Sequence, residues 1–137
     1  MADQINFELV SPERLLLSEP VEMVVVPGTE GDFGVLPGHA PLVSTVRPGV
    51  IAVFADGKVV QRIFVAGGFA EVTPERCTVL AEQALPVSDI DRVAAESEMA
   101  QARADLTEAK DEVERERLES RIAAAEARLA ALDNPVY

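Results

Sequence analysis

Two hydrophobic patterns divide the chain. From Ile5 to Ala81, short runs rich in β-branched residues alternate with Pro and Gly at intervals typical of a β-sandwich or barrel. From Ser88 onward Gly is absent, and apolar residues recur every three or four positions, as on one face of a helix. We therefore predict a β domain over residues 1–87 and a helical domain over residues 88–137. The predicted strands are Ile5–Val10, Leu15–Leu17, Val21–Val26, Leu42–Val46, Val50–Phe54, Val59–Val65, Phe69–Val72 and Cys77–Ala81.

Three local signals refine the β domain. Asp56-Gly57 lies between Val50–Phe54 and Val59–Phe64, and this dipeptide favours the positive φ angles of a tight hairpin that pairs the two runs. Pro20 lacks a backbone N–H donor, so it fits only an edge strand or a bulge. Gly67-Gly68 predicts a bend or a close approach between backbones.

The helical domain carries two apolar stripes. The stripes comprise Ala95, Met99, Ala102, Leu106, Ala109 and Val113, and then Leu118, Ile122, Ala125, Leu129 and Leu132. They are out of phase, because Val113 to Leu118 is a step of five, so we predict a helical hairpin that turns within residues 110–117. One long helix is the alternative, since no Gly or Pro interrupts that segment. Ser88 is the predicted N-cap, with Asp91 as its capping-box-like partner.

The stripes contain few large side chains. The segment from Ser88 to Tyr137 holds twelve alanines and twenty charged residues, so each helix buries little apolar area. Isolated helices of this length are marginal in water. We therefore expect the hairpin to dock weakly on the β domain and to exist in more than one arrangement.

Charge and composition exclude several functions. The formal net charge of −12 argues against binding to nucleic acid or, unaided, to an anionic membrane. The single cysteine, Cys77, cannot form an internal disulfide, which favours a reducing compartment. The first residues are acidic and polar, unlike a secretory or mitochondrial address. No apolar run approaches 18 residues, so any work at a membrane requires a partner that holds the protein there.

Candidate chemistry centres on His39, the only histidine. It could act as a base for Ser44 or Ser11 if Asp32 oriented it, but no Gly-x-Ser-x-Gly elbow occurs and Ser44 lies in a predicted strand. A structural or contact histidine is the commoner case. Cys77 has the pattern of a small buried residue, and one His with one Cys cannot build the usual zinc site.

The segment from Gly28 to Pro41 holds four of the eight glycines. Its Gly-x-x-Gly-x-x-Gly spacing is not a phosphate loop, because no Gly-Lys-Ser/Thr follows and its acidic residues would repel phosphate. Phe33, Val35 and Leu36 are expected to anchor the segment on the core, so that its polar groups are displayed. The segment is therefore either a contact surface for another protein or a simple connection between two sheets.

A longer motif carries a family resemblance. Glu30-Gly-Asp-Phe-Gly-Val-Leu-Pro-Gly-His-Ala-Pro-Leu42 resembles the signature of the ε subunit of bacterial and chloroplast F-type ATP synthases, called δ in mitochondria. The resemblance extends to Phe7-Glu-Leu-Val-Ser-Pro, Arg47-Pro-Gly-Val-Ile, Ala66-Gly-Gly-Phe-Ala-Glu-Val and the Ala-rich C-terminal helices. It implies a ten-stranded β-sandwich followed by an antiparallel two-helix hairpin.

The resemblance also implies a function and its sites. The family's ε subunit is a non-catalytic rotor subunit that binds γ, sits on the ring of c subunits and helps transmit proton-driven rotation to the catalytic head. It works at the cytoplasmic face of the bacterial inner membrane, and its hairpin can extend into the α/β head and block ATP hydrolysis. The implied c-ring contacts are Glu30, Gly31, Asp32 and Phe33, and the implied γ contacts are His39, Ala40 and Pro41. The implied regulatory residues are Asp91, Arg92, Arg103, Arg115, Arg117, Arg121 and Arg128.

The resemblance implies no metal and no catalytic residue, and one departure bears on a cofactor. Some relatives bind ATP in the hairpin through Ile/Leu-Asp-x-x-Arg-Ala, but Ala94 stands at the arginine position here, which removes the phosphate-binding guanidinium. We therefore expect weak or no ATP sensing. Apart from the resemblance, a rotor or adaptor subunit competes with a small ligand binder and with an enzyme. The binder is disfavoured because aromatic residues make up only 4% of the chain.

Overall fold

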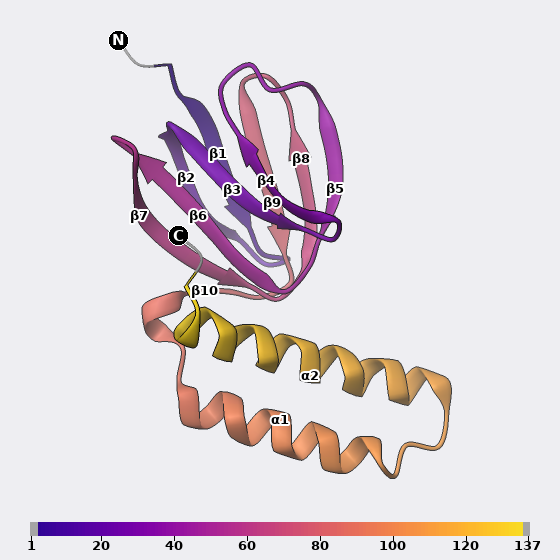
Figure 1. Ribbon diagram of the computed structural model, residues 1–137. Helices are drawn as coiled ribbons and strands as arrows, with labels where there is room; N and C mark the ends of the chain where they lie inside the picture. The colour runs from indigo at the N-terminus through magenta and orange to yellow at the C-terminus, as the bar shows by residue number, and fades with distance from the viewer. Residues whose placement is uncertain (1–2, 136–137) are drawn as a thin grey trace. The chain divides into compact units, whose positions relative to one another are not determined.

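The computed structural model describes residues 3–135, and the chain divides into two compact units between Pro86 and Val87 (Figure 1). The strands are β1 (Ile5–Val10), β2 (Leu15–Val21), β3 (Met23–Gly28), β4 (Gly31–Val35), β5 (Leu42–Val46), β6 (Gly49–Ala55), β7 (Lys58–Val65), β8 (Gly68–Val72), β9 (Arg76–Ala81) and β10 (Ala84–Pro86). They are followed by a 3₁₀ turn, η1 (Val87–Asp89), and by helices α1 (Arg92–Leu106) and α2 (Glu112–Asp133). The predicted class, a ten-stranded sandwich followed by a two-helix hairpin, is confirmed.

The first unit, here called the sandwich, is one sheet that curls back on itself (Figure 1). Its strand order is β10-β7-β6-β3-β5-β8-β9-β1-β2, with β4 paired to the remaining edge of β3. Most neighbouring strands are antiparallel, whereas β1 and β9 are parallel. Strands β3 and β5 share a single residue pair, Gly28 with Val46, and this is the corner at which the sheet passes from one layer to the other.

Alternating side chains from both layers fill the core. Along β1 every second residue is buried, and β9 shows the same alternation, as expected for strands with one face on a core. Cys77 lies in this core, which confirms its predicted role as a small buried residue. The largest fully buried side chains of the core cluster are Phe7, Ile5, Ile51, Val24, Val26, Val35, Val53, Val65, Val72 and Val79.

Two strands escaped the sequence pattern, and β2 extends well beyond its predicted end. β4 reads Gly-Asp-Phe-Gly-Val and β10 only Ala-Leu-Pro, and neither has the β-branched run that marks the other strands. The strand predicted at Leu15–Leu17 continues through Pro20 to Val21. Pro20 is tolerated because β2 is an edge strand that pairs with β1 only, as the sequence predicted.

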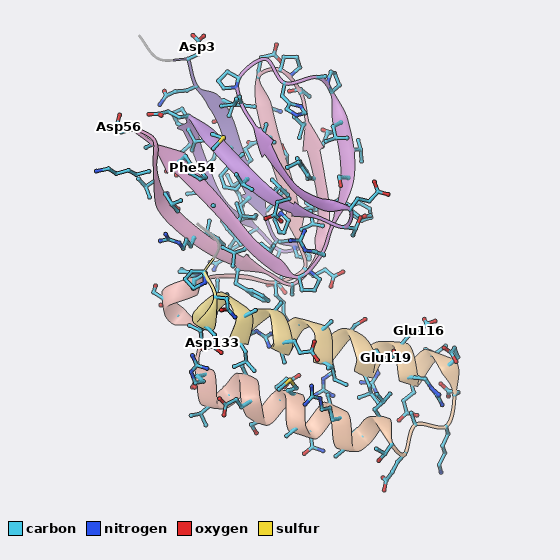
Figure 2. The ribbon with its side chains drawn as sticks, viewed as in Figure 1. Asp3, Phe54, Asp56, Glu116, Glu119 and Asp133 are labelled. Carbon is cyan, nitrogen blue, oxygen red and sulfur yellow. The ribbon has the colours of Figure 1, made fainter. Side chains whose placement is uncertain are left out.

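Both turn predictions in the sandwich are confirmed. Asp56 and Gly57 have φ angles of 54° and 73°, so they form the tight turn that joins β6 to β7, and Asp56 marks its tip in Figure 2. Gly68 has a φ of 141°, and a Cβ atom at this position would lie 1.8 Å from the Leu80 carbonyl oxygen. Only glycine fits where β8 approaches β9 so closely.

The second unit is here called the hairpin. The predicted pair of helices is confirmed, but the predicted helix ends are wrong. Ser88 is not the N-cap of α1, because it lies inside η1; the cap is Asp91, whose Oδ1 accepts a hydrogen bond from the Ala94 N–H at 3.1 Å. Asp91 adopts the extended conformation that a cap requires, with ψ at 111°. The turn lies earlier than predicted, between Leu106 and Glu112.

The early turn has a local cause. Asp111 caps α2 by accepting a hydrogen bond from the Glu114 N–H at 2.8 Å, and the Thr107 hydroxyl donates to the Ala104 carbonyl oxygen at 2.7 Å. Val113 therefore belongs to α2, where it is 78% exposed, and not to the stripe of the first helix. The sequence held this signal as Asp111-x-x-Glu114, which is a capping-box pattern.

Candidate partner-binding surfaces

The β3–β4 turn carries the residues implied as c-ring contacts. Glu30 is exposed at its tip, next to Gly31 with a φ of 133°. Asp32 has a partner within the chain, because its Oδ1 lies 2.5 Å from Nη2 of Arg47, and its side chain is 28% exposed. Phe33 is half-buried and packs against the sandwich core. The turn thus combines the anchored Phe33 side chain, an ion-paired aspartate and one exposed glutamate.

The loop between β4 and β5 carries the residues implied as γ contacts. Its backbone is fixed at Gly38, whose N–H donates to the Pro74 carbonyl oxygen at 2.8 Å. His39 is half-exposed, and its Nδ1 lies 2.7 Å from the Ala40 carbonyl oxygen. Val35 is buried, as expected of an anchor, but the same expectation for Leu36 is wrong, because that side chain is 54% exposed.

Strands β5, β8 and β9 carry an exposed apolar surface. Val43, Phe69 and Leu80 are 70%, 57% and 48% exposed. Phe69 on β8 pairs with Leu80 on β9. Val43 on β5 lies diagonal to Phe69, so the three side chains share the outer face of the layer formed by these strands. We call these three residues the apolar patch. Exposed apolar side chains gathered on one face are typical of an interaction surface.

The patch was missed in the sequence because the outer face of its strands mixes apolar and polar residues. Thr45 and Glu71 lie on that face beside Val43 and Phe69. Periodicity therefore indicated strands without indicating which apolar side chains remain exposed.

The groups considered for nucleophilic catalysis are engaged in separate contacts. The Ser44 hydroxyl donates to the Thr45 carbonyl oxygen at 2.9 Å, His39 contacts Ala40, and Asp32 binds Arg47. These contacts do not form the nucleophile–base–carboxylate relay of a triad. Burial raises the pKa of the Cys77 thiol to about 12, which keeps it protonated and unreactive at neutral pH.

Within residues 3–135, His, Cys, Asp and Glu side chains form no group of three or more that could hold a metal ion. The helices of the same range include none that is long and apolar enough to cross a membrane.

The two helices of the hairpin are joined by ion pairs across their interface. Arg92 at the start of α1 binds Asp133, with Nη2 2.5 Å from Oδ1. Asp133 lies at the end of α2, where Figure 2 labels it. Near the middle, Arg121 Nε lies 2.9 Å from Glu98 Oε1. This pairing between helices differs from the pairing within one helix that sequence spacing suggests for Asp111 and Arg115.

A third ion pair joins the helices, and the pairing lowers the pKa values of two carboxyl groups. Arg103 Nη2 lies 3.2 Å from Glu126 Oε1. The hydrogen bond from Arg121 lowers the pKa of Glu98, and the hydrogen bond from Arg92 lowers the pKa of Asp133.

The remaining implied regulatory arginines lie on α2. Arg115 and Arg117 are exposed, and the half-buried Arg128 is close enough to Glu98 to contribute to the lowering of its pKa. The apolar contact beneath these charges is small, because the buried residues of the two helices are Ala95, Ala102, Leu118, Ala125 and Ala131.

The start of α1 bears on ATP binding. Asp91 is occupied as the N-cap, and Ala94 stands exposed where some relatives have arginine. Arg92 does not replace that arginine, since its guanidinium binds Asp133.

Sequence comparison identifies similar proteins over nearly the whole chain. Residues 4–87 match the family model described as ATP synthase, Delta/Epsilon chain, beta-sandwich domain. A protein named ATP synthase epsilon chain from Rhodospirillum rubrum is 59% identical over 131 residues, which cover 96% of this chain and 98% of the relative. Its namesake from Rhodospirillum centenum is 55% identical over 134 residues, covering 94% of this chain and 92% of the relative.

Two solved structures resemble the whole chain. One chain of the Euglena gracilis mitochondrial ATP synthase structure, described as OSCP/F1/c-ring in rotational state 1, aligns with a TM-score of 0.80 and 30% identity. That alignment covers 94% of this chain and 81% of the Euglena chain. A chain of the Tetrahymena thermophila central stalk/c-ring structure aligns with a TM-score of 0.65 over 96% of this chain and 98% of its own length. At 13% identity, the Tetrahymena chain supports the fold alone.

Proposed function

The chain belongs to the ATP synthase delta/epsilon family, and from this premise we propose that it is a rotor subunit of the central stalk. It couples rotation of a proton-driven c ring to ATP synthesis in the catalytic head, and it catalyses no reaction itself. The similarity of 94% of this chain to a chain from an F1/c-ring assembly supports this role. Its location is then the cytoplasmic face of the bacterial inner membrane, where the complex holds it.

The apolar patch is the observation that carries the proposal. Three large side chains stand in water on adjacent strands, and covering them with a partner is favourable. We propose that the γ subunit is that partner. His39, Ala40 and Pro41 lead directly into β5, which carries Val43, so the implied γ contacts adjoin the patch along the chain.

Complex formation with γ tests this proposal. The full chain is mixed with γ from the same organism, and the mixture is analysed by size-exclusion chromatography with light scattering. We expect a 1:1 complex that survives deletion of residues 88–137, because the patch lies on the sandwich. Phe69→Glu places an unpaired charge in the interface and should abolish the complex.

A matched control uses another exposed apolar residue of the sandwich. Val60 on β7 is 55% exposed but lies outside the patch, so Val60→Glu should bind γ normally. Equal loss in both variants would show a general effect of added charge. If wild-type protein and folded γ form no complex, a stand-alone binding module becomes the better interpretation.

The hairpin is proposed to regulate ATP hydrolysis. Its helices bury mostly alanine and are joined by exposed ion pairs, so a second arrangement costs little free energy. In that arrangement Arg121 exchanges Glu98 for acidic surfaces of the α/β head, which the exposed Arg115 and Arg117 also meet. A chain ending at Val87 should raise ATP hydrolysis by the assembled complex, and unchanged hydrolysis would exclude inhibition by the hairpin.

We propose that ATP does not bind the hairpin. The N-cap role of Asp91 and the pairing of Arg92 with Asp133 leave Ala94 at the position where a phosphate-binding guanidinium is needed. Isothermal titration of the full chain with ATP should give no saturable heat. Saturable binding that persists in Arg92→Gln would show that ATP binds through residues other than an arginine at the start of α1.

A further inference from the structure

The β3–β4 turn is tied to the strand that begins the second layer. The Thr29 N–H donates to the Thr45 carbonyl oxygen at 3.1 Å, and the hydroxyl oxygens of the same two residues lie 2.8 Å apart. Immediately beside them, Gly28 pairs with Val46 at the corner of the sheet. The turn is therefore supported from β5 and does not project as a free loop.

Arg47, the residue after β5, adds the strongest of these contacts. Its backbone N–H donates to the Pro27 carbonyl oxygen at 2.9 Å. Its guanidinium reaches across the turn, with Nη1 2.5 Å from the Gly28 carbonyl oxygen and Nη2 2.5 Å from Asp32 Oδ1. One planar side chain thus holds both sides of the turn, a geometry that suits arginine and that a single ammonium cannot reproduce.

The ion pair between Arg47 and Asp32 determines which carboxylate charge the β3–β4 turn presents to a partner. Arg47 and Asp32 carry opposite charges at contact distance, so together they contribute little net field beyond the turn. Glu30 lies two residues before Asp32, exposed at the tip. The family resemblance implies that both acids face the c ring, whereas these contacts separate them into a support and a recognition group.

We propose that Arg47 is a positioning residue for c-ring binding, acting with Asp32 to fix the β3–β4 turn so that Glu30 is its recognition carboxylate. The inference rests on the proposed function, because it assumes that the turn meets the ring. Fixing the turn in advance removes the cost of ordering it when the ring binds. The groups recognised on the ring are hydrogen-bond donors or cations of its polar loops.

Affinity measurements on full-length variants test the division of roles. The chain bound to γ is immobilised, and c rings purified in detergent from the same organism are the probe. We expect Glu30→Gln to weaken binding by about tenfold, since it removes a charged contact. Asp32→Asn and Arg47→Gln should each weaken it by about threefold, and the double variant should be no worse than either single variant, because both break one support. Arg47→Lys should fall between wild type and Arg47→Gln.

Hydrogen exchange in the isolated chain gives a second readout. Exchange of the amides of residues 29–32 should accelerate in Arg47→Gln and Asp32→Asn but not in Glu30→Gln. Glu22→Gln is the matched control, because Glu22 Oε2 accepts a hydrogen bond from the Asp56 N–H at 2.7 Å and so supports a different turn. This control removes one carboxylate charge, as Asp32→Asn does, and should leave ring affinity unchanged.

The outcomes separate this inference from the proposed function. If wild type binds the ring and the losses of Asp32→Asn and Arg47→Gln multiply in the double variant, Asp32 contacts the ring directly and the inference is wrong. Faster exchange at residues 29–32 with unchanged affinity would also overturn it. If the wild-type γ complex does not bind c rings at all, the proposed function fails and the inference fails with it.

Discussion

The sandwich and the hairpin are stabilised by different kinds of contact. The sandwich buries large side chains such as Phe7, Ile5 and Ile51 between two layers of paired strands. In the hairpin, four of the five buried residues of α1 and α2 are alanine, and the helices are joined by ion pairs whose side chains are 34% to 58% exposed. Apolar burial is insensitive to pH and little affected by salt, whereas exposed ion pairs respond to both.

The difference suits the two proposed roles. A unit that connects the c ring to the γ subunit must keep its shape under mechanical load, and a large, close-packed apolar core provides this rigidity. A regulatory segment must change its packing for a small free-energy difference, and alanine contacts with exposed charges provide that. Four substitutions or conditions test the contrast, from the largest expected effect to the smallest.

The largest effect is expected at Gly68 in the sandwich. Gly68→Ala places a Cβ atom 1.8 Å from the Leu80 carbonyl oxygen at a φ of 141°, so β8 and β9 must separate. We expect a loss of about 3 kcal/mol or more in the free energy of unfolding, measured by urea denaturation. Alkylation of Cys77, which is protected in the folded core, should accelerate in parallel.

Gly34→Ala is the matched control for Gly68→Ala. A Cβ atom at Gly34 meets its nearest neighbour, the Met23 sulfur, at 3.6 Å, which is an ordinary contact. The control should change stability by less than about 1 kcal/mol. Similar losses in both variants would show that the close approach at Gly68 is not what limits the sandwich.

The next effect is expected at Leu118, which is the one large side chain fully buried among the described residues of the hairpin. Leu118→Ala should destabilise the hairpin by about 2 kcal/mol, at the low end for buried leucine because the other buried residues of α1 and α2 are alanines. Ellipticity at 222 nm should fall at lower temperature, while the NMR signals of the sandwich stay in place. Val113→Ala is the control, since Val113 is 78% exposed. Simultaneous loss of both sets of signals would contradict independent stabilities.

The sequence was most informative where each element carries its own local signal. The Asp56-Gly57 turn, the edge position of Pro20 and the burial of Cys77 were all predicted, because each depends on a property of one or two residues. β4 and β10 were not, since they are strands only because β3 and β7 offer them partners. Tertiary pairing overrides weak propensity in such cases.

The candidate surfaces were predicted less completely than the fold. The segment with Glu30 and His39 was identified by its glycines and its motif, but the support from Arg47 joins residues 15 and 19 positions apart and has no local signature. The ion pairs between helices were missed for the same reason, because they depend on the hairpin's register, and the predicted turn was several residues too late. Long-range pairs of this kind follow from topology and not from spacing.

Acid should affect the hairpin before the sandwich. The pKa values of Glu98 and Asp133 are lowered in the folded state by their hydrogen bonds to arginine. A lowered folded pKa means that these pairs stabilise the hairpin above the unfolded values, near 4.5 and 3.8, and that the stabilisation is lost as pH falls through the folded values. Helical ellipticity should therefore decline from about pH 4.5 downward, whereas sandwich signals should persist.

The matching control for acid is the pair-deficient variant Glu98→Gln/Asp133→Asn. It has no carboxylate to protonate at these two sites, so its helical signal should be lower at pH 7 and should change less on acidification. A sandwich that loses its NMR signals at the same pH as the hairpin would contradict the contrast between the two units. An unchanged acid response in the variant would assign the effect to other carboxylates.

The smallest effect is expected for a single ion pair. Arg121→Gln removes the ion pair with Glu98. Because both side chains of this pair are substantially exposed, the hairpin's melting temperature should fall by less than in Leu118→Ala. Arg115→Gln, on the exposed surface of α2, is the control for loss of one positive charge. Because salt screens such pairs, the difference between the two variants should shrink as NaCl is raised towards 1 M, where the Debye length is about 3 Å. A difference that persists at high salt would mean that Arg121 stabilises the hairpin by packing its aliphatic stem, and the hairpin would then resemble the sandwich more closely than its charges suggest.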